Sequence, residues 1–109
     1  MQIEFTGRQT DVPPGLRATA EKKLQKLSRT LREITHAHVI LTADKHRQIA
    51  EVTVQCRRFA LSAQEESTNL LASLGTVMDR LQRQAQRRAA KRRLRKRESV
   101  RAAPSGREA

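Results

Sequence analysis

Basic side chains recur at helical spacing in the second half of the chain, where they could bind a row of phosphates. Four of them follow at intervals of three, four and four residues: Arg80, Arg83, Arg87 and Lys91. At about 100° per residue, this spacing puts them along one side of a helix. Guanidinium forks match phosphate oxygens, and each neutralised phosphate releases condensed counterions. The ridge predicts a polyanion-binding surface, with a merely solvated face as the alternative.

A second basic group lies in the first half of the chain. Lys22, Lys26 and Arg29 fall on the side of an expected helix that faces away from its apolar stripe, and Lys23 lies on the flank. Two cationic helix faces in one small chain weaken the solvated alternative. No Tyr or Trp is present and the two Phe do not lie in exposed runs, so we expect recognition of RNA shape and backbone, without stacking on bases.

Other residue types suggest neither catalysis nor a metal site. His36 and His38 would share one face of a strand, but no third ligand is evident, so we expect no metal. Glu65 and Glu66 are adjacent, and we interpret them as charges near the positive end of a helix and not as a catalytic pair. We therefore expect a protein that is not an enzyme and uses no cofactor.

The elements that carry these residues follow from the periodicity of apolar side chains. Alternation predicts strands over residues 2–6, ended by Gly7, and over 36–42, 49–56 and 58–64. A helix opens at Pro13 and Pro14, and a second begins between residues 67 and 69. The order β-α-β-β-β-α predicts an α+β fold with two helices on one face of a four-stranded sheet. The apolar stripes of the two helices are Leu16, Ala20, Leu24, Leu27 and Leu31, then Leu70, Leu74, Val77, Met78, Leu81 and Ala85.

Charge is distributed unevenly along the 109 residues, which have a net charge of +12. Residues 80–109 hold twelve basic and two acidic residues, whereas residues 1–79 are nearly balanced. We expect an α/β domain over 1–86, a basic helical extension over 87–99 and a disordered tail over 100–109. Beyond Ala85 the stripe continues as Arg88 and Arg92, so the extension should project from the body. A single cysteine and no apolar stretch of about 20 residues predict a cytoplasmic protein without a membrane partner.

Several segments together resemble a known family. They are 1–8, 16–17 with 22–27, 34–41 with 45–52, and 79–84. In combination they look like the ribosome hibernation-promoting factor, or ribosome-associated translation inhibitor, family over about residues 1–84. Two places differ from many relatives: Asn69, Leu70 and Leu71 stand where an Asp-Met-Tyr opening is common, and Arg57 and Arg58 stand where an Asn-Gly turn is frequent.

The resemblance implies a stress protein that binds the small ribosomal subunit near the decoding centre, blocks messenger and transfer RNA, and thereby inhibits translation. It implies ribosomal RNA contacts at the basic residues of both helices. The chain would be a short form, or a long form cut at its linker, and a monomer off the ribosome. With the neighbouring cations included, the expected RNA-binding residues are Lys22, Lys23, Lys26, Arg29, Arg80, Arg83, Arg87, Arg88 and Lys91.

Two other functions fit the composition. A general RNA-binding or ribosome-assembly protein would need only the basic charge, and should lose affinity steeply with salt on any nucleic acid. A regulatory module that binds a protein partner would keep its partner after nuclease treatment. We further hypothesise that residues 87–97 follow the RNA channel, in which case truncation after Gln84 should change ribosome affinity.

Overall fold

The computed structural model describes the backbone of residues 1–101 and the side chains of residues 1–91. The elements are β1 (Gln2–Arg8), α1 (Pro14–Thr30), β2 (Ile34–Ala43), β3 (Gln48–Cys56), β4 (Ala60–Ser67) and α2 (Leu70–Arg101). The strands form one sheet in the order β1-β2-β3-β4. β1 pairs with β2 in parallel, and the other two pairings are antiparallel. The predicted β-α-β-β-β-α fold is confirmed.

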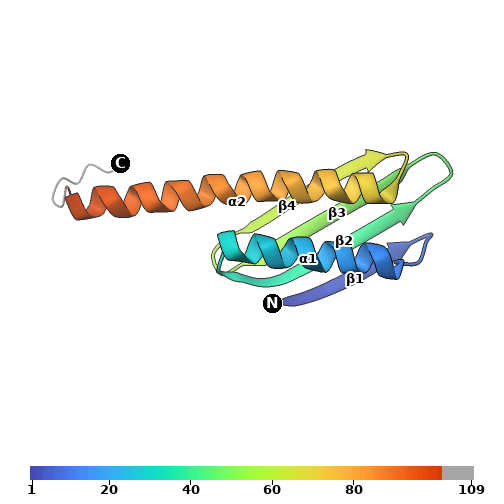
Figure 1. Ribbon diagram of the computed structural model, residues 1–109, viewed down its shortest axis with the longest axis horizontal. Coiled ribbons are helices and arrows are strands. Elements are labelled where there is room, and N and C mark those ends of the chain that lie inside the picture. The colour runs from blue at the N-terminus through green and yellow to red at the C-terminus, as the bar shows by residue number, and fades with distance from the viewer. Residues whose placement is uncertain (102–109) are drawn as a thin grey trace.

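Both helices pack on one face of the sheet (Figure 1). β4 regains the direction of β2 after two antiparallel pairings, and β1 already has that direction. The helix that follows β1 and the helix that follows β4 therefore run back the same way, and Figure 1 shows them side by side. This arrangement turns the outer sides of α1 and α2 into a single surface, which we call the helical surface.

The core lies between the helices and the sheet and is built from small and branched apolar residues. The alternation predicted for β3 is confirmed, since Ala50, Val52, Val54 and Cys56 are all buried. The stripes of both helices face them, including the fully buried Leu24, Leu27, Leu74, Val77, Leu81 and Ala85. The buried residues recur at the helical period on α1 and α2 and at the strand period on β3. Their packing against each other holds the two layers together.

Most strand boundaries differ from the sequence predictions by one to three residues, because backbone pairing decides them. β2 covers Ile34–Ala43 instead of 36–42, and β3 begins at Gln48 instead of residue 49. Gly7 does not end β1, since it still pairs with Leu41. At the other end of the sheet, the Cys56 amide donates to the carbonyl of Phe59 at 2.8 Å and closes a tight turn. Arg57 and Arg58 lie in that turn, so β4 begins only at Ala60 and continues to Ser67 opposite Gln48.

The start of α2 is capped by Asn69. Its Oδ1 accepts hydrogen bonds from the amides of Leu71 at 2.8 Å and Ala72 at 3.1 Å, which satisfies two amides that lack helical partners. The interpretation of Glu65 and Glu66 as helix-terminal charges is wrong. Both are part of β4, and each pairs with an arginine instead of a helix end.

α2 continues beyond the body as one uninterrupted helix. At about 1.5 Å per residue, its 32 residues span about 48 Å. Among the side chains that the structure describes, Ala85 is the last buried one on its stripe, and the helix extends past the end of the sheet (Figure 1). It ends at Arg101, two residues inside the tail expected over 100–109, and residues 102–109 lie outside the described residues. None of the described helices is long and apolar enough to cross a membrane.

Candidate nucleic-acid interface

All nine predicted RNA-binding residues have exposed side chains. Four lie on α1 and five on α2, so the packing of the helices brings the two basic groups onto the same helical layer. Gln82 Nε2 donates to Thr30 Oγ1 at 2.9 Å, which ties α2 to the last turn of α1. This bond fixes the position of the basic residues of α1, which we call the first cationic row, relative to those of α2, the second cationic row.

The side of α2 that faces β4 makes three contacts at intervals of one helical turn. Arg80 Nη2 pairs with Glu65 Oε1 at 2.8 Å, and its Nη1 donates to the carbonyl of Gln64 at 3.3 Å. One turn later, Gln84 Nε2 donates to the carbonyl of Ser62 at 3.5 Å. After another turn the Arg88 guanidinium lies 3.9 Å from the centre of the Phe59 ring. These contacts attach α2 to the outer edge of the sheet.

The basic ridge on α2 consequently divides into two kinds of cation. Arg80 is held by a carboxylate and a carbonyl, so part of its charge is neutralised within the protein. Arg83, Arg87 and Lys91 are exposed and form no side-chain hydrogen bond or ion pair with the described residues. The latter three are the cations on α2 that are most available to an external phosphate.

The side chain of Arg88 is exposed to solvent and also contacts the β3–β4 hairpin. Phe59, which the sequence suggests only as an inward-facing strand residue, is half-buried and covered by this guanidinium. The neighbouring Cys56 is buried, and burial raises the pKa of its thiol; the charge of Glu33 raises this pKa further, while Arg88 lowers it. Arg88 therefore lies close enough to influence the β3–β4 turn electrostatically.

Several exposed cations are missing from the sequence-based set of binding residues. Arg32 lies in the turn after α1, and Arg57 and Arg58 lie in the β3–β4 turn. Arg17, near the start of α1, lies over the Phe5 ring at 4.5 Å. The three turn residues belong to no periodic pattern, so only their placement in three dimensions relates them to the helical surface.

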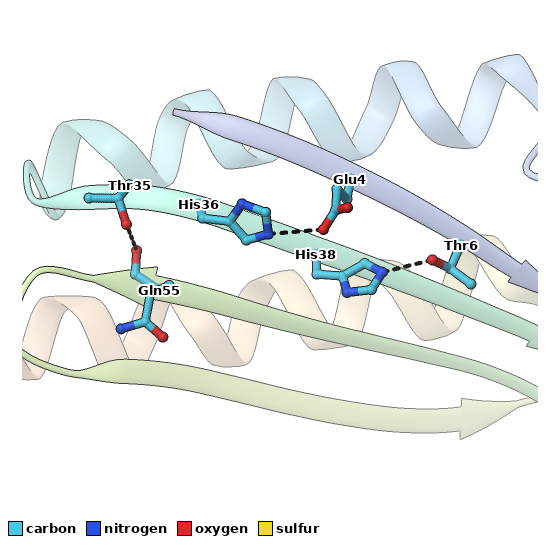
Figure 2. Close-up of polar contacts among 6 residues, drawn as sticks. All are labelled: Glu4, Thr6, Thr35, His36, His38 and Gln55. Atoms are coloured by element: carbon cyan, nitrogen blue, oxygen red, sulfur yellow. Dashed lines mark hydrogen bonds and ion pairs between the residues drawn. The ribbon is translucent and has the colours of Figure 1, made fainter.

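The open face of the sheet carries polar side chains in cross-strand pairs. His36 Nε2 lies 3.1 Å from Glu4 Oε1, and His38 Nε2 lies 2.7 Å from Thr6 Oγ1. Figure 2 shows both contacts between β1 and β2. The two histidines share a strand face, as predicted, but each contacts a β1 side chain. Within the part of the chain that the structure describes, no three His, Cys, Asp or Glu side chains form a group that could hold a metal ion.

The fold and this surface define an α+β domain with a cationic helical layer. Residues 3–93 match the family model described as Sigma 54 modulation protein / S30EA ribosomal protein. The chain therefore belongs to this family, and the resemblance to ribosome hibernation-promoting factors is confirmed.

Relatives and solved structures agree with this membership. The ribosome hibernation promoting factor of Azotobacter vinelandii is 33% identical over 84 residues, which cover 77% of this chain and 78% of that protein. A ribosomal subunit interface protein from Coxiella burnetii superposes with a TM-score of 0.75 at 30% identity, covering 83% of this chain and 99% of that one. The N-terminal domain of Thermus thermophilus Protein Y gives a TM-score of 0.73 at 30% identity, covering 80% and 98%.

Proposed function

We propose that this protein is a ribosome hibernation factor that binds the small ribosomal subunit through ribosomal RNA near the decoding centre. There it blocks the binding of messenger and transfer RNA and so inhibits translation. The observation that carries the proposal is the pair of exposed cationic rows on adjacent, parallel helices in a chain of this family. We place its action in the cytoplasm during stress, as a monomer off the ribosome, with no cofactor, membrane partner or catalytic step.

The mechanism is electrostatic and steric. A net charge of +12 attracts the chain to a polyanionic cleft, and the release of counterions favours binding. Cations on two helices fix the orientation, because the Gln82–Thr30 bond and the contacts with β4 hold the rows in place. The molecule, whose extents are 58 × 24 × 17 Å with the projecting part of α2 included, then occupies space that RNA ligands would need.

A general RNA-binding or ribosome-assembly role is the second candidate, and the high net charge favours it. Under that role, affinity should depend on the number of cations and not on which helix carries them. Arbitrary RNA should then compete as well as small ribosomal subunits do.

A pair of charge-reversed variants separates the two. Lys26→Glu combined with Arg83→Glu changes one exposed cation on each helix. Lys45→Glu combined with Arg47→Glu makes the same change in net charge in the β2–β3 loop, away from the helical surface. We expect the first variant to lose inhibition of translation in vitro and co-sedimentation with small subunits, and the second to retain both.

Either of two results would count against the specific role. Full inhibition by the Lys26 and Arg83 variant would show that the helical surface is not needed. Equal losses in both variants would favour general attraction to nucleic acid, because position on the fold would then not matter.

A further inference from the structure

The end of the sheet from which α2 projects gathers four arginines from separate segments. Ile34 at the start of β2 pairs with Cys56 at the end of β3, so the turns beside these two residues lie at the same end. The α2 helix passes over this end, where Arg88 covers Phe59. We call these four residues the arginine end cluster: Arg32, Arg57, Arg58 and Arg88.

The charge of this cluster is not matched by ion pairs within the body. All four side chains are exposed, and none forms a salt bridge with a carboxylate among the described residues. Glu33 lies nearby, as its effect on Cys56 shows. Bringing like charges together opposes folding unless solvent, salt or a polyanion screens them.

The opposite end of the same sheet is arranged differently. There Arg47 of the β2–β3 loop lies 3.8 Å from Glu66, and Arg80 of α2 pairs with the adjacent Glu65 at 2.8 Å. Asp44 lies in the same loop. Two of the cations at that end are thus paired with carboxylates, whereas none of the four arginines of the cluster is paired with a carboxylate of the described residues.

The contact with Phe59 also fixes the side chain of Arg88 before any ligand binds. A guanidinium that lies on an aromatic ring uses its flat face for the ring, and its N–H edge can still donate to phosphate oxygens. Because Arg88 is already held 3.9 Å from the ring centre, less side-chain freedom is lost when it binds. A guanidinium that is already ordered favours binding to phosphate, and together with the other arginines of the cluster it suits a ligand with regularly spaced phosphates.

We propose that the arginine end cluster is a second binding site for the sugar-phosphate backbone of RNA. It lies between Arg29 in the last turn of α1 and Lys91 on α2, so it joins the helical surface to the projecting part of α2. The RNA would then contact the body along the helices and around this end. This inference rests on the proposed function, and it adds turn residues that helical periodicity does not reveal.

The test compares two variants with the same net charge. Arg57→Gln with Arg58→Gln alters the cluster, while Lys45→Gln with Arg47→Gln is the matched control at the far end of the sheet. Dissociation constants for purified small subunits are measured across a series of salt concentrations. We expect the cluster variant to bind about tenfold more weakly and to reduce the slope of log affinity against log salt by about one to two, with the control unchanged.

A single substitution, Arg32→Gln, provides a second test in case the hairpin variant folds poorly, which circular dichroism would reveal. We expect it to weaken binding about threefold and to lower the salt slope by about one. Wild-type affinity in both variants would overturn the inference, as would weaker binding with an unchanged salt slope, which would point to a protein contact. If the wild-type chain itself does not bind small subunits, the proposed function is wrong. This result differs from failure of the present inference alone, in which the wild-type chain binds and the variants bind equally well.

Discussion

At the scale of single residues, cations with similar exposure have different roles because of their neighbours. Arg80 and Arg83 lie three residues apart on α2 and are both exposed. Arg80 joins the helix to β4 through Glu65, whereas Arg83 has no such partner among the described residues. A binding measurement alone would not distinguish a phosphate ligand from a residue that fixes the helix, but a combined measurement of stability and binding would.

Substitution of these two arginines should affect different quantities. Arg83→Gln is expected to weaken small-subunit binding several-fold without changing the free energy of unfolding, because only an external contact is lost. Arg80→Gln should lower the free energy of unfolding by at most about 1 kcal/mol, since an ion pair that remains partly exposed to solvent contributes little. Urea denaturation and subunit binding, measured on both variants, check this.

The partner variant Glu65→Gln closes a double-mutant cycle for the pair. If Arg80 and Glu65 interact as described, the double variant should lose less stability than the sum of the single variants. Strict additivity would contradict the assigned role of Arg80, and so would a loss of stability in Arg83→Gln as large as that in Arg80→Gln.

At the scale of elements, α2 combines two kinds of helix in one continuous rod. Its first half is stabilised by an apolar stripe that packs on the sheet, ending at the buried Ala85. Its second half has strong intrinsic helix formers in the sequence but no continuation of that stripe. Packing therefore stabilises the first half, and local propensity supports the second.

The packing of the first half can be tested with two leucines on the same helix. Leu81 is fully buried against the sheet, whereas Leu71 is 54% exposed. Leu81→Ala should lower the free energy of unfolding by about 2–5 kcal/mol, because it removes buried methyl groups and leaves a cavity. Leu71→Ala should change it by no more than about 0.5 kcal/mol. Comparable losses in the two variants, measured by chemical denaturation, would show that α2 does not dock as described.

At the scale of the whole molecule, cationic side chains are concentrated on the helical layer and at the end of the body from which α2 projects. The helical surface and the arginine end cluster are cationic, while the open sheet face carries Glu4 and Glu51 along with Arg8 and the two histidines. The projecting part of α2 extends the cationic side beyond the body (Figure 1). The molecule can thus engage a polyanion over a length greater than that of its folded core.

Ending the chain after Arg88 isolates the contribution of this projecting segment. The shortened chain keeps every residue that is buried among those whose side chains the structure describes, as well as the contact of Arg88 with Phe59, and it loses eight basic residues. We expect nearly unchanged thermal stability, weaker binding to small subunits and a shallower dependence of affinity on salt. An unchanged affinity and salt slope would mean that residues 89–109 do not contact RNA.

Local patterns in the sequence were sufficient for the order of the elements and for most of the core. The stripe from Leu70 to Ala85 and the alternation in β3 depend on residues two to four positions apart, and burial follows these periods directly. The same patterns predicted that Lys22, Lys26 and Arg29 face away from the apolar stripe of their helix, and all three are exposed. They could not predict that Gly7 continues β1 or that β4 begins at Ala60, because strand ends depend on a pairing partner.

Only the tertiary structure decided which charges meet. Arg80 and Glu65 are fifteen positions apart, and Arg88 and the Phe59 ring that it covers are twenty-nine apart, so no short-range period relates either pair. Their proximity depends on α2 crossing back along β4, and that path is set by packing of the core and by strand register. The sequence by itself determined the elements and their buried faces, whereas the fold determined which cations are held within the protein and which are exposed without a partner among the described residues.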